Sequence, residues 1–221
     1  MSTASASVIL QLLGGLLESL KLAIVVLTLG SLGGLLLGGF GALGGRPGRY
    51  VVNVLLYFVR GIPLLIHAFA VFYVLPLFGL RLPPFTSAAL ALSIFASVTI
   101  SEIIRGGIVS VPSSQVEAAL ALGFTRLKAF LLVVLPQALR FVVPPMVGQF
   151  VSLIKATSII SLLGVSELMY SGREIIERTL QGFEVMTLIW LLYTAVCLPL
   201  SAWGRWLERR LLVAGSAPIR G

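Results

Sequence analysis

The stretch Glu117–Pro136 reads EAALALGFTRLKAFLLVVLP and places a polar segment inside a largely apolar chain. Of the 221 residues, 58% are hydrophobic and only 11% are charged. Soluble domains average about 25% charged residues, so these charges are too few to cover a water-facing surface. Several apolar stretches reach the roughly 20 residues that a helix needs to cross a bilayer. The composition predicts an all-α polytopic membrane protein, with one transmembrane domain over residues 1–221.

We expect five membrane-spanning helices, over residues 20–43, 50–77, 85–104, 129–154 and 185–206. Gly30, Gly34 and Gly38 repeat at a spacing of four in the first, which lets another helix approach closely. Residues 7–19 carry a narrow polar stripe and predict a separate amphipathic helix at the membrane interface. Prolines in the spans are expected to set kinks, and they include Pro63, Pro136, Pro144 and Pro145.

The net charge of +8 comes from basic residues whose distribution among the connectors indicates how the chain is oriented in the membrane. No basic cluster carries interleaved aromatic residues, which argues against a nucleic-acid partner. Lys and Arg collect in cytoplasmic loops, and the alternate connectors of this chain differ strongly in basic residues. The bias predicts an N-terminus outside, a C-terminus in the cytoplasm and a cytoplasmic segment over residues 113–128.

The sequence lacks the residue sets of common enzymes. Gly39–Gly44 matches GxGxxG, but a membrane helix precedes it where a dinucleotide site needs a strand. No GxxxxGK[ST], HExxH or CxxC pattern occurs, and His67 is the single histidine. Cys197 is the single cysteine, so no intrachain disulfide forms. We therefore expect no catalytic residues, no metal site and no resident cofactor.

Local patterns predict the shape of the cytoplasmic segment. Ser114 and Glu117 fit the capping box S-x-x-E, which predicts a helix that starts near Gln115. Gly123 is the expected stop of that helix. Small residues at Ala118 and its neighbours would let a partner surface approach the backbone. These residues predict a docking element and leave its partner unnamed.

The residue spacing within Glu117–Pro136 resembles the motif of a known protein family. Glu117-Ala118-Ala119, three residues, Gly123, nine residues, Val133, one residue and Leu135-Pro136 resembles the EAA motif of ABC-importer permeases. Val133 replaces the usual isoleucine. Flanking segments resemble the polar amino-acid group of that family, which includes histidine, glutamine, glutamate, arginine and opine permeases. These segments are EIIRGGI at 102–108, LPQALR at 135–140, FVRGIPLL at 58–65 and KATS at 155–158.

The resemblance implies a permease subunit of an ATP-driven, binding-protein-dependent importer of a polar amino acid, in a bacterial inner membrane. The implied partners are a dimer of separate ABC ATPase subunits that bind the ATP, an extracytoplasmic binding protein and a second, identical or similar permease chain. The substrate moves by alternating access. The implied ATPase-coupling residues are Glu117, Ala118, Ala119, Gly123, Phe124, Leu135 and Pro136.

Departures from the family pattern leave the substrate open among a basic or neutral polar amino acid and an opine. Ile62 stands for the usual threonine of RGTP, His67 for a frequent glutamine, Ala156 for the aspartate of KDTS and Gly148 for an asparagine.

Two alternatives from other functional classes remain. A self-sufficient channel or ion-coupled secondary transporter is disfavoured by the short chain and the lack of an inverted repeat. A membrane-embedded enzyme is disfavoured by the missing catalytic set.

Polar residues within the spans are candidates for the substrate path. Arg60 carries a charge in the second span, where it needs either a structural partner or a substrate. Glu102 is expected to pair with Arg105 or another basic group, and His67 is either a packed polar residue or a substrate contact. One further helix face combines Gln149, Ser152 and Lys155, at a spacing of three.

Overall fold

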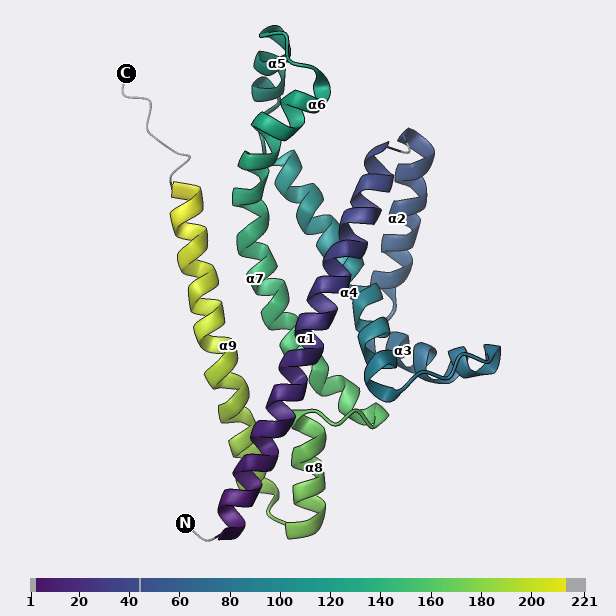
Figure 1. Cartoon of the computed structure of the whole chain (residues 1–221), viewed down its shortest axis with the longest axis vertical. Helices are drawn as coiled ribbons and strands as arrows, with labels where there is room; N and C mark the ends of the chain where they lie inside the picture. Colours follow the sequence, from purple (N-terminus) through teal and green to yellow (C-terminus); the bar gives the residue numbers. More distant parts are fainter. Residues whose placement is uncertain (1–2, 44, 214–221) are drawn as a thin grey trace.

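The computed structural model describes residues 3–43 and 45–213, and within these ranges the chain is almost entirely helical (Figure 1). Short turns join the helices. The α-helices are α1 Thr3–Leu43, α2 Gly45–Gly61, α3 Leu64–Phe69, α4 Pro84–Val109, α5 Ser113–Ala121, α6 Arg126–Ala129, α7 Leu135–Ile160, α8 Leu168–Thr179 and α9 Gly182–Val213. Two π-helical turns, η1 Ala70–Val74 and η3 Phe130–Val134, and two 3₁₀ turns, η2 Leu75–Phe78 and η4 Ser161–Leu163, complete the fold.

Four helical segments of the described chain are long and apolar enough to cross a membrane. They are Ala6–Gly41, Pro84–Val109, Arg126–Leu163 and Gly182–Leu211. A fifth span results if the bent pair Gly45–Gly61 and Leu64–Phe78 is counted as one. The all-α membrane fold is therefore confirmed, although the helices run past several of the predicted boundaries.

The predicted second span is broken within its bounds. The chain turns by 100° between α2 and the helical segment that follows it, and the latter projects sideways from the bundle (Figure 1). Pro63 sits at the turn with φ −55° and ψ 141°. Proline offers no N–H to continue a helix and forces Ile62 away from the helical region. The kink expected at Pro63 is therefore a complete break.

Residues 7–19 do not form a separate helix, because α1 continues through them into the first span. Their polar stripe faces α8: Gln11 donates to the Glu174 carboxylate at 3.2 Å and accepts from Arg178 at 2.5 Å. Leu12 is buried in a small apolar cluster with α8 and α9. The stripe thus has a protein partner, which periodicity alone does not distinguish from a membrane interface. With 41 residues, α1 is about 60 Å long.

Glycines let α1 pack tightly against α4. A Cβ at Gly30 would lie 2.7 Å from the Cβ of Ala96, and one at Gly34 would lie 2.9 Å from the Ile100 side chain. These two glycines of the predicted row are confirmed as a close helix contact. Gly38 would meet nothing within 4 Å, so its expected role is wrong.

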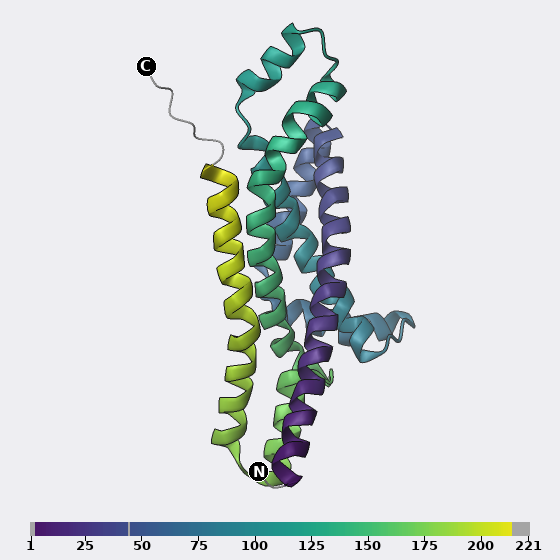
Figure 2. The same ribbon diagram turned by 60° about the vertical axis from the view of Figure 1, so that its left-hand side comes forward.

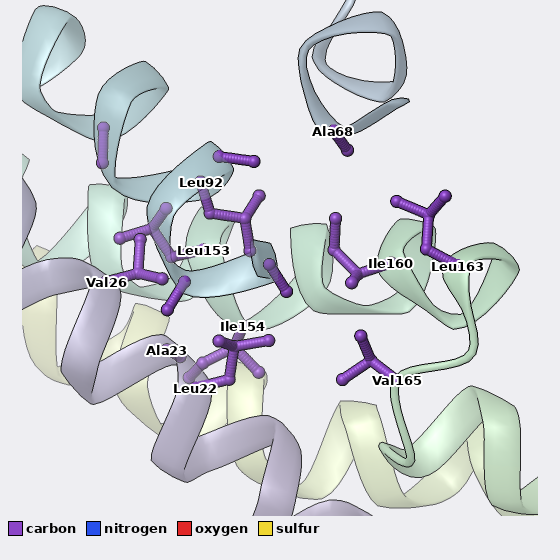
Figure 3. Packing of buried hydrophobic residues seen from close by; sticks show 14 of the residues in the cluster. Leu22, Ala23, Val26, Ala68, Leu92, Leu153, Ile154, Ile160, Leu163 and Val165 are labelled. Carbon is purple, nitrogen blue, oxygen red and sulfur yellow. The ribbon is translucent and has the colours of Figure 1, made fainter. Parts of the chain in front are cut away.

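The main apolar core lies where α1, α3, α4 and α7 meet (Figure 3). Its fully buried side chains are apolar and of small to medium size, and they include Leu22, Ala23 and Val26 of α1, Ala68 of α3, Leu92 of α4 and Ile154 of α7. By contrast, α9 lies along one side of the bundle, beside α7 and α8 (Figure 2). Several large apolar side chains of α9 are exposed, among them Trp190, Leu198 and Trp203.

Candidate functional site: a docking helix and an intramembrane groove

The helix α5 and the short α6 stand together at one end of the molecule (Figures 1 and 2). The other end is formed by α8 and the start of α1. The helix α9 ends on the α5 side. Residues 113–125, most of the predicted segment, therefore form a projection beyond the spanning helices, and α6 begins the next span.

Gly123 ends α5 as predicted. Its φ is +83°, a left-handed conformation that glycine adopts without steric cost. The Gly123 N–H donates to the Leu120 carbonyl at 2.9 Å, and the Phe124 N–H donates to the Ala119 carbonyl at 3.1 Å. This pair of bonds is the Schellman motif, which satisfies carbonyls left open at a helix end. The Thr125 hydroxyl then accepts from the Lys128 N–H at 3.3 Å and caps α6.

The predicted capping box is wrong. Pro112 occupies the N-cap position and no side chain caps the helix there. Ser114 already lies inside the first turn, so its hydroxyl is not placed to accept from the exposed N–H groups. The helix thus starts at Ser113, two residues earlier than the predicted Gln115. Glu117 is thereby left without this structural role, and it is exposed.

The predicted coupling residues separate into an outer and an inner group. Glu117, Ala118 and Phe124 are exposed, whereas Ala119 is only 3% exposed. Val116, on the same inward side of α5, packs on the cluster of Val111, Val134 and Ala138. This cluster fixes α5 to η3 and the start of α7, where Leu135 and Pro136 lie. One side of α5 is thus anchored and the other is free for contact with a partner.

Two exposed leucines at the tip extend this outer surface. Leu122 is 78% exposed and Leu127 is 67% exposed. Sequence reasoning overlooked them, because an exposed leucine has no motif of its own. Their position on a projecting segment next to Gly123 is the signal that only the structure provides. Together with Glu117, Ala118 and Phe124 they form what we call the docking surface.

A groove runs between α7 and α9 through the membrane-spanning part of the molecule. Its first cavity has a volume of about 600 Å³ and is lined by Lys155, Ser158, Trp190, Tyr193, Thr194, Cys197, Leu198, Ser201 and Arg205. The second, of about 400 Å³, is lined by Pro144, Pro145, Val147, Gly148, Val151, Ser152, Lys155, Ser201, Gly204, Arg205 and Glu208. Both share Lys155, Ser201 and Arg205, so the two cavities form one continuous groove.

The structure brings two of the three predicted α7 residues into this groove. Ser152 and Lys155 line it, while Gln149 does not. Sequence reasoning missed Arg205, although a charged residue within the apolar stretch of the last span was a visible signal. The hydroxyls of Ser152 and Ser158 donate to carbonyls of their own helix, at 3.0 and 2.7 Å. Their oxygen lone pairs can still accept hydrogen bonds from a ligand.

Arg60 forms an ion pair with Glu102, as predicted if both charges have a structural role. The guanidinium contacts the Glu102 carboxylate from the last turn of α2, immediately before the break at Gly61–Pro63. Arg60 is not among the residues that line the groove. The pair joins α2 to α4 and neutralises two charges that would be costly alone within a membrane.

His67 lies on α3, away from the groove residues. Its Nδ1 is 3.3 Å from the Pro63 carbonyl oxygen, and its ring meets Phe95 edge-on at 6.0 Å. The second ring nitrogen, Nε2, is buried without a hydrogen-bond partner among the described residues. His67 is thus largely packed into the protein, while one polar atom stays unsatisfied.

Glu167 is a buried carboxylate that sequence reasoning did not identify. It caps α8 by accepting from the Tyr170 N–H at 2.8 Å, and it accepts from the hydroxyls of Ser19 at 3.0 Å and Tyr193 at 3.1 Å. These bonds join α1, α8 and α9. Burial raises the pKa of the Glu167 carboxyl above its ordinary value of 4.5, because desolvation outweighs the hydrogen bonds that favour the charged form.

Comparisons with known proteins agree with this geometry. A model of the family described as "Binding-protein-dependent transport system inner membrane component" matches residues 30–213. The glutamine transport system permease protein GlnP of Escherichia coli (strain K12) is 35% identical over 204 residues, which cover 90% of this chain and 93% of that protein. The L-cystine transport system permease protein TcyB of Bacillus subtilis (strain 168) is 41% identical over 167 residues, 75% of this chain and 71% of that protein.

A solved structure supports the fold match over nearly the whole chain. The crystal structure of an amino acid ABC transporter with histidines superposes with a TM-score of 0.88 and 30% sequence identity. The match covers 95% of this chain and 100% of that one. With the family match over residues 30–213, it follows that the chain belongs to the inner-membrane permease components of binding-protein-dependent ABC transport systems.

Proposed function

We propose that this permease imports a polar amino acid by alternating access, driven by separate ABC ATPase subunits that bind the ATP. The observation that carries the proposal is the α5 projection, which is anchored on one side and exposes a glycine-terminated surface on the other. Relatives named for glutamine and cystine transport support an amino acid as the substrate. An extracytoplasmic binding protein and a second permease chain complete the proposed complex.

The docking surface is the proposed contact with the ATPase. Glu117, Ala118 and Phe124 would touch the ATPase, while Ala119 and the Leu135-Pro136 pair hold α5 in position on α7. Movement of the ATPase is then transmitted to α7 through η3. In this arrangement the α5 end is cytoplasmic and the N-terminus is outside, in line with the basic residues around α5 and α6.

The α7–α9 groove is the proposed translocation path. Its polar lining lies in apolar spans, where lipid is an unfavourable neighbour. A second permease chain over the exposed side of α9 would cover the groove and enclose a polar route. Ser152 and Lys155 are the favoured path residues, and Gln149 lies between the lining residues Gly148 and Val151 without lining the groove itself. Arg60 and His67, near the break in the second span, would contact substrate only if the Arg60–Glu102 pair opened.

The test is uptake in liposomes that contain the permease with and without its ATPase and binding protein. Labelled amino acid should accumulate only with all components and ATP. Transport by the permease alone down a gradient would instead identify a channel or secondary transporter. Ala118→Trp on the docking surface should abolish co-purification of the ATPase. Ala70→Trp, at an exposed alanine on η1, is the control and should leave it unchanged.

A further inference from the structure

The α7–α9 groove carries more positive than negative charge. Lys155 and Arg205 line both cavities, while Glu208 lines only the second. The ion pairs found in the described part of the chain are Lys21–Glu18 and Arg60–Glu102. Neither Lys155 nor Arg205 therefore has an acidic partner within those residues, and the first cavity contains two cations and no carboxylate.

The surroundings of Lys155 indicate what its positive charge can bind. Lys155 lines the same cavity as Cys197, which is at the midpoint of the 32-residue α9. Lys155 is exposed on α7 within an apolar span, so water or an anion must stabilise its ammonium there. Arg205 lies two turns farther along α9, on the same groove.

We propose that the groove selects an acidic amino acid, with Lys155 and Arg205 as the residues that bind its two carboxylates. This inference deepens the proposed transport function and rests on it. An acidic amino acid has two carboxylates and one ammonium, so its net charge of about −1 opposes the excess in the groove. A guanidinium can hold a carboxylate through two parallel hydrogen bonds, whereas the lysine ammonium binds as a point charge.

Hydroxyls along the groove can bind the remaining groups. Ser158 already donates to the Lys155 carbonyl at 2.7 Å, so its oxygen is free to accept from the ammonium of the substrate. Thr194 and Ser201 line the same cavity and can donate to carboxylate oxygens. The cavity of about 600 Å³ has room for one amino acid and its ordered water. A basic amino acid would add a third cation to the first cavity.

The experiment measures equilibrium binding to the purified permease–ATPase complex without its binding protein, so that only the membrane site is read. Labelled L-glutamate should bind at least about 10-fold more tightly than L-glutamine or L-arginine. Lys155→Met and Arg205→Met should each remove that preference by weakening glutamate binding alone about 10-fold. Lys155→Arg should keep it. Arg209→Met, on the same helix outside both cavities, is the control and should bind as the wild type does.

The opposite results overturn the inference in distinguishable ways. Equal binding of glutamate, glutamine and arginine by the wild-type complex would refute charge selection without any variant. An equal loss for all three ligands in Lys155→Met would assign Lys155 a structural role. Displacement of glutamate by phosphatidylglycerol vesicles but not by unlabelled glutamate would assign the groove to lipid. ATP-driven uptake of a neutral or basic amino acid would preserve the proposed function while refuting the acidic substrate.

Discussion

Replacement of Gly123 by alanine should weaken ATPase binding by changing the backbone alone. Gly123 has φ +83°, and a Cβ at this position would meet no atom within 4 Å. The substitution therefore causes no collision, and its cost is that of holding an L-residue in the left-handed region, about 1–2 kcal/mol. If the ATPase binds only the bend seen here, that cost lowers the competent fraction and weakens the affinity about 5- to 30-fold.

Titration of labelled ATPase subunit against permease in lipid nanodiscs measures this change. Gly123→Asn should lose less affinity, because asparagine tolerates the left-handed region better than alanine does. Gly106→Ala is the matched control: this glycine also has open space around a Cβ, but it lies inside α4 without a positive φ. Affinities of Gly123→Ala and Gly106→Ala that agree with the wild type would refute the claim that docking requires the bend.

Three further predictions concern stability and pairing. The raised pKa of Glu167 means that its carboxyl binds protons more tightly in the folded chain, so its contribution to stability should fall as pH rises above about 4.5. Glu167→Gln should remove this pH dependence, and parallel curves of unfolding temperature against pH for the two proteins would contradict it. Gly30→Leu should overpack the α1–α4 contact by about 1–3 kcal/mol and lower the unfolding temperature in detergent, whereas Gly38→Leu should not. Arg60→Glu and Glu102→Arg should each reduce the amount of folded protein in the membrane, and the double exchange should restore it; equal loss in all three would argue against the pair.

Features with a local cause were predictable from the sequence. Gly123 was identified because a helix stop needs a residue that accepts positive φ, and no distant contact decides that choice. Pro63 was expected to disturb the second span for an equally local reason. The size of the turn, 100°, was not predictable, because it depends on how the next segment packs beside the bundle. Similarly, the serine of an apparent capping box cannot cap once Pro112 has taken that position.

Features that join distant segments could not be read in advance. Glu167 finds Ser19 and Tyr193 on two other helices, and no pattern around position 167 announces these partners. The spacing on α7 pointed to Lys155, and the charge of Arg205 within the last span was visible, but only the structure shows that the two line one groove. Gln149 misses the lining because a spacing of three falls short of the 3.6-residue turn, which leaves Gln149 about 120° from Lys155 around α7.

The position of the Gly30–Gly34 contact along α1 determines how far each end of the helix moves when the helix tilts about it. The close contact at Gly30–Gly34 divides the helix unequally, with about 40 Å on the α8 side and about 14 Å on the other. A rigid helix that tilts about this contact moves its long arm about three times as far as its short arm. A displacement of 1 Å near the end that carries α5 would thus become a shift of about 3 Å at the opposite end. Because the long arm also packs on α8 through Gln11 and Leu12, such a tilt would have to carry α8 with it.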